Sequence, residues 1–127
     1  MLYLDSSAFV KLIHSEPETD ALRAAVAGVA TFSSELLACE ASRAATQIGS
    51  ATERAAERAL GGIALVPISR ELLFAAARLL PADLRSLDAI HLATVLRSGE
   101  RLSALVTYDR RLADAAEHHG LNVLAPV

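Results

Sequence analysis

The sequence predicts an α/β fold: a three-layer sandwich with a five-stranded parallel sheet flanked by helices. Short apolar runs alternate with segments of helical periodicity along the whole chain, which is typical of parallel α/β sheets. The 127 residues are 53% hydrophobic and 21% charged. This composition excludes a disordered chain and is enough for one core. We therefore expect a single domain over residues 1–127.

Helix starts and stops divide the N-terminal half. The segments Ser15–Glu18 and Ser50–Glu53 each match a capping box, in which a Ser and a Glu three residues later satisfy free backbone N–H groups. Gly49 and Gly61-Gly62 are expected to end the helices before them. The predicted elements are a strand at Leu2–Asp5, helices at Ser6–His14 and from Ser15 to about Ala27, a strand at Val29–Phe32, and helices at Ser34–Ile48 and from Ser50 to Gly61.

The C-terminal half repeats the alternation with shorter loops. Ser69, Ser86 and Asp109 are residue types that favour helix N-caps, and each precedes a helical pattern. Gly120 is expected to stop the last helix. The predicted elements are a strand at Ile63–Val66, a helix from Ser69 to about Leu80, a helix at Leu87–Arg97, a strand at Leu105–Thr107, a helix from Asp109 to about His119, and a strand at Val123–Leu124.

Two aspartates directly follow predicted strands. Asp5 ends the first strand and Asp109 comes just after the fourth. Ligands of parallel α/β sheets bind beyond the carboxyl ends of the strands. Neighbouring parallel strands are about 4.8 Å apart, so the two carboxylates could share one ion if their strands are adjacent. Each could instead be an ordinary helix N-cap.

Two further carboxylates lie in apolar helices. Asp88 is in the first turn of its helix, where it could also complement the helix dipole. Glu40 is predicted on an apolar face, where carboxylates are rare unless paired or metal-bound. Its neighbours at helical spacing are Leu36, Leu37, Ala44 and Ile48. A right-handed crossover would bring both helices beside the first strand. Four oxygen donors suit Mg²⁺ or Mn²⁺, which would relieve their mutual repulsion.

Several polar residues near these acids are candidate supports. Ser6 and Thr107 could orient ligands or water, although hydrogen bonding at a helix start or strand end is an equal alternative. Arg43 is one turn beyond Glu40 and could contact phosphate groups, or be a solvated surface charge. His91, three residues after Asp88, is expected in the core as a structural or supporting histidine.

The motifs YLDSSAFVKL, SSELLACEASRA, SLDAIHLATVL and LVTYDRRL, in this order, resemble the PIN domain, and most of all the VapC-type toxins of prokaryotic toxin–antitoxin pairs. The resemblance covers Leu2 to Leu124. It implies a PIN-like sheet and a metal-dependent endoribonuclease of the type II toxin class. The implied pocket, which would hold Mg²⁺ or Mn²⁺, consists of Asp5, Glu40, Asp88 and Asp109. The resemblance also implies a homodimer and a cognate antitoxin whose C-terminal segment covers the pocket.

Charge and cysteine content limit the other possibilities. The net charge of −3 lacks the basic footprint usual for nucleic-acid binding, but the four acids exceed that whole charge. A lone Cys39, no secretory leader and no apolar run of roughly 20 residues lead us to expect a cytoplasmic protein without a membrane partner. A catalytically silent binding module remains an alternative. An Asp-based phosphoryl-transfer domain is disfavoured, because it needs a late Lys and a second acid where Ser7 stands.

Overall fold

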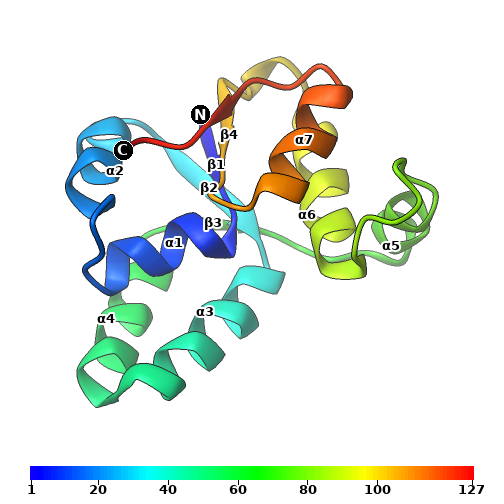
Figure 1. The fold of residues 1–127 in the computed structure, drawn as a ribbon. Helices are drawn as coiled ribbons and strands as arrows, with labels where there is room; N and C mark the ends of the chain where they lie inside the picture. Colours follow the sequence, from blue (N-terminus) through cyan, green and yellow to red (C-terminus); the bar gives the residue numbers. More distant parts are fainter.

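Five parallel strands form the centre of the computed structural model, which describes residues 1–127 (Figure 1). The strands are β1 (Leu2–Leu4), β2 (Thr31–Ser34), β3 (Ala64–Val66), β4 (Ala104–Val106) and β5 (Val123–Leu124). Their spatial order is β3-β2-β1-β4-β5, so β1 is central and pairs with β2 and β4. All four pairings are parallel. The predicted five-stranded parallel sheet is therefore confirmed.

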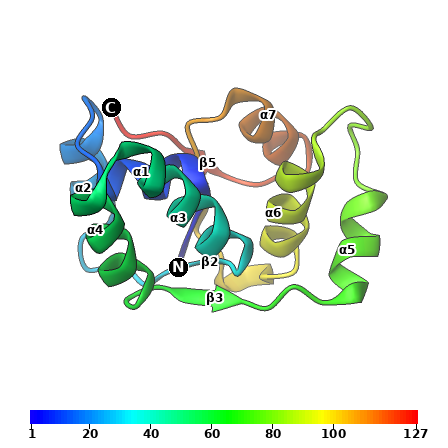
Figure 2. The same cartoon turned by 90° about the horizontal axis from the view of Figure 1, so that it is seen from below.

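Seven α-helices surround the sheet, as predicted. They are α1 (Ser6–Ile13), α2 (Thr19–Val26), α3 (Leu36–Ile48), α4 (Ser50–Leu60), α5 (Arg70–Ala77), α6 (Ser86–Leu96) and α7 (Arg110–His118). A 3₁₀ turn, Gly99–Arg101, precedes β4. Figures 1 and 2 show α6 and α7 on one side of the sheet, α1 and α2 on the other, and α3 and α4 beyond the carboxyl ends of the strands. None of these helices is long and apolar enough to cross a membrane.

The core is divided by the sheet into two apolar layers. Tyr3 and Leu105 pack with the side chains of α6 and α7, including Leu92. Their strand neighbours Leu4 and Val106 point the opposite way and pack against α1 and α2. Because successive strand residues face opposite sides, burial of both sets requires apolar residues throughout β1 and β4. The predicted uninterrupted apolar strands follow from this double burial.

Both predicted capping boxes are wrong. At the first, Thr19 rather than Ser15 organises the chain: its Oγ1 accepts the Glu16 N–H at 2.9 Å and donates to the Lys11 carbonyl at 2.7 Å. This turn delays the start of α2 to Thr19. At the second, the N-cap of α4 is Gly49, whose φ of 152° lies outside the range that L residues favour. Neither helix has a side-chain cap.

Three other boundaries also differ from the prediction. Strand β2 begins at Thr31 rather than Val29, because the Val29 N–H still bonds to the Val26 carbonyl at the end of α2. Ser86 is the first residue of α6 and not its cap. Helix α5 ends at Ala77 rather than near Leu80. The caps predicted at Ser69 and Asp109 are confirmed, since both side chains accept backbone N–H groups of the first turn.

The buried face of α6 should dominate stability. Leu92 is fully buried between β1, β4 and α7. We expect Leu92→Ala to lower the free energy of unfolding by about 2–5 kcal/mol, because it leaves a cavity in the core. Urea unfolding of the metal-free protein measures this. The control Leu87→Ala alters a half-exposed residue of the same helix and should change stability by less than about 0.5 kcal/mol. Equal losses in the two variants would contradict the packing described.

Candidate active site

Asp5 lies at the carboxyl end of the central strand and is almost fully buried. Its Oδ1 accepts the Ala8 N–H at 3.0 Å, which makes it the N-cap of α1, and also accepts the Ser7 hydroxyl at 2.7 Å. Its Oδ2 accepts the hydroxyl of Thr107, just after β4. The N-cap role and the site position are therefore combined in one residue, whose carboxylate joins the ends of β1 and β4.

Two hydroxyl groups connect Asp5 to the end of β4. Besides donating to Asp5, Thr107 Oγ1 accepts the Asp109 N–H at 3.1 Å. Ser7 Oγ accepts the Tyr108 N–H at 2.9 Å. Sequence reasoning selected Ser6 because it follows Asp5 directly, but Ser7 is the serine that contacts the carboxylate. The first turn of α1 brings the residue two positions after a cap back toward it, and this geometry was the signal that could have found Ser7.

Glu40 projects from α3 at the border of its buried face, with 19% of its side chain exposed. The predicted apolar face of this helix was partly wrong: Leu37 is buried as predicted, and Leu36 and Ala44 are partly buried. The buried residues are Leu37, Ala41 and Ala45, whereas Ile48 is 42% exposed. Glu40 Oε1 lies 2.6 Å from Nε2 of His91 on α6. The expectation that His91 is buried is confirmed, and its partner explains how a carboxylate is accommodated here.

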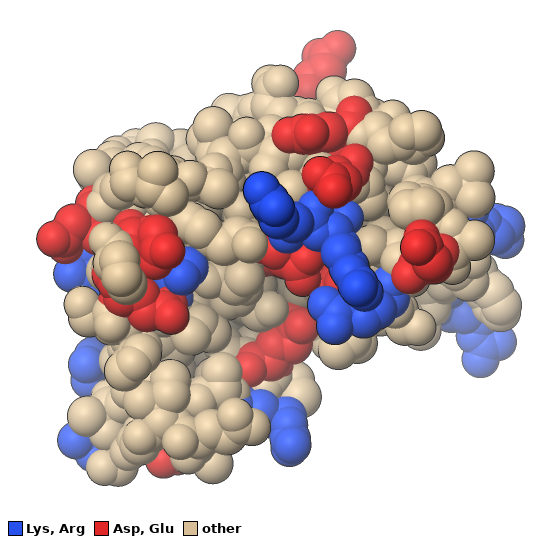
Figure 3. Space-filling view, in the orientation of Figure 1, with Lys and Arg blue, Asp and Glu red and all other residues tan.

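Arg85 connects the other two acids. Its Nε lies 3.4 Å from Asp88 Oδ2, and its Nη2 donates to Asp109 Oδ2 at 3.3 Å. Asp109 Oδ1 caps α7 by accepting the N–H groups of Arg111 and Leu112. Asp88 Oδ2 is buried and, despite its proximity to Arg85, forms no hydrogen bond. Figure 3 shows acidic side chains in the recess in the middle of this face, with basic side chains beside them.

Burial shifts two of these carboxyl groups in the same direction. It raises the pKa of Asp5, although hydrogen bonds from Thr107, Ser7 and Ala8 oppose the shift. Burial also raises the pKa of Asp88; the negative charge of Asp109 adds to this, and Arg85 opposes it. In both residues the protein stabilises the charged form less than water does. A cation bound at the site would compensate for this deficit.

The donor set fits a hard divalent cation. All four predicted acids supply carboxylate oxygens, and the buried Asp88 Oδ2 lies 3.4 Å from Arg85 Nε without forming a hydrogen bond. Thr107 bridges Asp5 and Asp109 by hydrogen bonds to the Asp5 carboxylate and the Asp109 N–H. Arg85 bridges Asp109 and Asp88 by ion pairs with both carboxylates. Glu40 is connected to α6 through His91. The side chains do not enclose an ion as they stand, because no three Asp, Glu, His or Cys groups converge in a metal-binding arrangement.

The basic and aromatic residues near the acids have different surroundings. Arg43 is exposed on α3. Lys11 pairs with Glu16 and Glu18 and lies 4.8 Å from the ring centroid of Tyr108. The charge of Lys11 is therefore already neutralised by Glu16 and Glu18. The predicted supporting role of Arg43 rests on its position one turn after Glu40.

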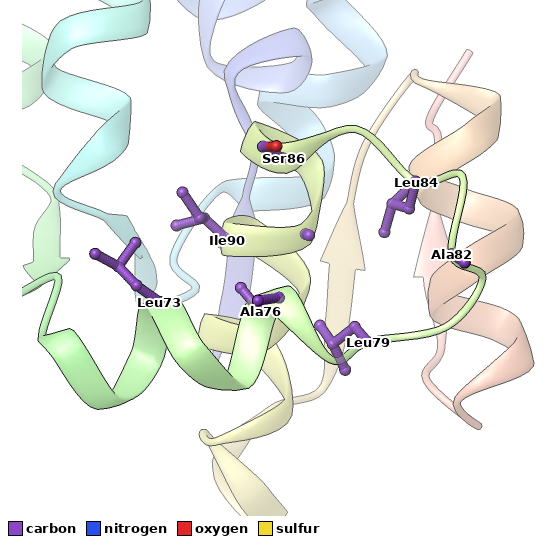
Figure 4. A pocket seen from close by; sticks show the side chains of 9 residues that line it. Leu73, Ala76, Leu79, Ala82, Leu84, Ser86 and Ile90 are labelled. Carbon is purple, nitrogen blue, oxygen red and sulfur yellow. The ribbon is translucent and has the colours of Figure 1, made fainter.

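An apolar cavity lies apart from the acids, between α5 and α6 (Figure 4). It measures about 390 Å³, and Ser86 is the one lining residue that is not hydrophobic. The other residues that line it are Leu73, Ala76, Ala77, Leu79, Ala82, Leu84, Ala89 and Ile90. No titratable side chain lines it.

Comparison with known proteins identifies the family of this chain. The model of the PIN domain matches residues 2–118. Ribonuclease VapC46 of Mycobacterium tuberculosis (strain ATCC 25618 / H37Rv) is 46% identical over 126 residues, covering 98% of this chain and 97% of that protein. Ribonuclease VapC47 of the same species (strain CDC 1551 / Oshkosh) is 38% identical over 133 residues, covering 99% and 97%.

A solved structure supports the fold independently of sequence similarity. The crystal structure of Mycobacterium tuberculosis VapC20, described as a sarcin-ricin loop cleaving toxin, superposes with a TM-score of 0.74 at 15% identity. The match covers 91% of this chain and 95% of that one. From the family model, the full-length relatives and this shared architecture, we conclude that the chain belongs to the PIN-domain family and, within it, to the group of VapC ribonucleases.

Proposed function

We propose that this protein is a divalent-metal-dependent endoribonuclease that acts as the toxin of a type II toxin–antitoxin pair. The observation that carries the proposal is the buried Asp88 oxygen, which forms an ion pair with Arg85 but no hydrogen bond and lies near Asp5 and Asp109 at the carboxyl ends of the strands. The relatives named ribonuclease VapC, which are matched over nearly their whole length, support RNA as the substrate. That full-length match also supports one domain over residues 1–127.

The four acids would hold the ion, with Asp5 and Asp88 as direct ligands and Glu40 and Asp109 contributing directly or through water. We propose Mg²⁺ as the ion, with Mn²⁺ able to replace it. When bound, it supplies Lewis-acid activation of water and stabilises the departing oxygen of the cleaved phosphodiester.

The remaining polar residues position these acids. Thr107 and Ser7 fix the Asp5 carboxylate by donating to its two oxygens. Arg85 holds Asp88 and Asp109 near each other, and its largely exposed, forked guanidinium suits a phosphate oxygen of the RNA. Ser6 and Arg43 flank the acids from α1 and α3, and Arg43 is exposed for contact with the RNA backbone.

A cognate antitoxin and a homodimeric assembly complete the proposal, and both are supported by the resemblance to VapC toxins. A catalytically silent module of the same fold is the main alternative, and the unenclosed arrangement of the acids favours it. The presence of all four acids favours the enzyme. Thermal unfolding with added Mn²⁺ separates the two, because only an ion-binding site raises the melting temperature.

The first test of function removes the charge of Asp88. Asp88→Asn should lower Mg²⁺-dependent RNA cleavage by about 100-fold or more, since even loss of a group that supports a metal ligand costs up to about that factor. It should also abolish growth inhibition when the protein is expressed. The matched control is Asp114→Asn, which neutralises an exposed acid on α7. Cleavage that persists in EDTA, or an equal effect of the two substitutions, would contradict metal-dependent catalysis at this site.

The second test uses the pH dependence of stability in EDTA. A carboxyl whose native pKa is raised destabilises the fold increasingly as pH rises from its ordinary value, here 3.8, through its native value. At neutral pH, metal-free Asp88→Asn should therefore melt at a higher temperature than the wild type. The difference should shrink toward pH 4, where the wild-type Asp88 becomes protonated.

Thermal unfolding followed by circular dichroism between pH 4 and pH 7 measures this difference. Asp114→Asn again serves as the control, and its melting temperature should follow that of the wild type across the range. A stabilising effect of Asp88→Asn that grew toward acid pH would show that Asp88 is better stabilised in the native state than in the unfolded chain, contrary to its surroundings here.

A further inference from the structure

A chain of two short hydrogen bonds runs from the central strand to the candidate metal ligand on α3. Tyr3 Oη of β1 lies 2.6 Å from His91 Nδ1, and His91 Nε2 lies 2.6 Å from Glu40 Oε1. Tyr3 is fully buried and His91 is 1% exposed. The Tyr3 and His91 rings also meet edge to face, with centroids 5.8 Å apart. Both nitrogens of a buried imidazole are therefore engaged, one of them by a candidate metal ligand.

When Glu40 acts as a metal ligand and His91 is neutral, the groups involved set the direction of both bonds. A carboxylate only accepts hydrogen bonds, so His91 Nε2 must carry the hydrogen and donate it to Glu40. A neutral imidazole then has a lone pair on Nδ1, which accepts the Tyr3 hydroxyl. A tyrosine hydroxyl is protonated at neutral pH and can donate this hydrogen bond. In this arrangement both imidazole nitrogens of His91 have a hydrogen-bond partner.

Helix α6 carries both His91 and Asp88, three residues apart and therefore one turn apart on the same side. The helix thus supplies one candidate ligand itself and holds another across the gap to α3. Since His91 bonds to Oε1 of Glu40, the second carboxylate oxygen is left free. A glutamate on a helix surface otherwise samples several rotamers, and their loss on ion binding would weaken affinity. Fixing one oxygen in advance removes part of that entropy loss.

We propose that His91, with its tautomer set by Tyr3, is a positioning residue that holds the Glu40 carboxylate for the divalent ion. The inference rests on the proposed function, because it takes Glu40 to be a ligand. It assigns the histidine a role that packing alone does not require. The rest of this face of α6 is filled by Leu92 and Val95, apolar residues that need no hydrogen-bond partners.

The closing experiment measures Mn²⁺ affinity by isothermal titration calorimetry on the full chain. His91→Leu removes the bond to Glu40 and should weaken Mn²⁺ binding roughly 10- to 100-fold, the range for groups that orient metal ligands. His91→Gln keeps a side-chain N–H donor and should recover most of that loss. Tyr3→Phe retains the ring but releases Nδ1, so its affinity should fall between those of the wild type and His91→Leu.

Phe32→Leu provides the matched control. Phe32 packs edge to face on Tyr3, with ring centroids 5.2 Å apart, but takes no part in the hydrogen-bond chain. It should lower the melting temperature while leaving Mn²⁺ affinity within roughly 2-fold of the wild type, since it alters packing alone. A purely structural histidine would give the opposite pattern, in which Mn²⁺ affinity follows stability in all variants. If His91→Leu does not fold, the comparison of Tyr3→Phe and His91→Gln with Phe32→Leu decides between the two.

A second measurement needs no metal. The ¹⁵N chemical shifts of His91 in the metal-free protein should report the neutral tautomer with hydrogen on Nε2, and Tyr3→Phe should reduce its population. Hydrogen on Nδ1 in the wild type would overturn the inference. Mn²⁺ affinity unchanged in His91→Leu would overturn it alone, leaving the proposed function in place. A wild-type chain that binds no Mn²⁺ would overturn the proposed function together with the inference.

Discussion

The parallel pairing of β1 with β4 in the middle of the sheet is the constraint on which the site depends. The register aligns Leu4 with Val106, so both strands end at the same level. The next residue on β1 is then Asp5, and the next on β4 is Thr107, whose hydroxyl donates to the Asp5 carboxylate. A shift of one residue in this register would separate Asp5 from Thr107. Backbone pairing of β1 with β4 therefore fixes the positions of Asp5 and Asp109 whatever their side-chain rotamers.

Helix α6 adds the second half of the site through its own periodicity. Arg85, Asp88 and His91 follow one another at intervals of three residues, which places them along one side of the helix. Arg85 donates a hydrogen bond to Asp109, and His91 bonds to Glu40. Asp88, between them, forms an ion pair with Arg85 but no hydrogen bond. One rigid helix thus sets the spacing among groups from α3, α6 and the start of α7, which favours a precise arrangement over one built on loops.

Patterns within short sequence segments were enough to predict the strands, the helices and their order. Apolar runs and helix stops identified the five strands and seven helices, and the position of Asp5 and Asp109 after strands placed them at the correct edge. His91 was expected as a core or supporting histidine, but its partners and those of Ser7 and Arg85 were not predicted, because these contacts join segments far apart in sequence. The buried face of α3 was predicted only in part for the same reason, because the side of this helix that is buried depends on where α1 and α4 pack. Glu40 lies at the border between the buried and the exposed side.

Asp5 and Asp88, the two proposed direct ligands of the ion, differ in their structural roles. Asp5 begins α1 and ties together the two innermost strands, so its loss would disturb the architecture as well as the reaction. Asp88 caps no helix and joins no strands, and burial of its charged carboxylate lowers stability when no ion is present. In a lineage released from selection for cleavage, drift would therefore remove Asp88 early and retain Asp5. An inactive descendant would keep the appearance of an intact first motif long after the enzyme was gone.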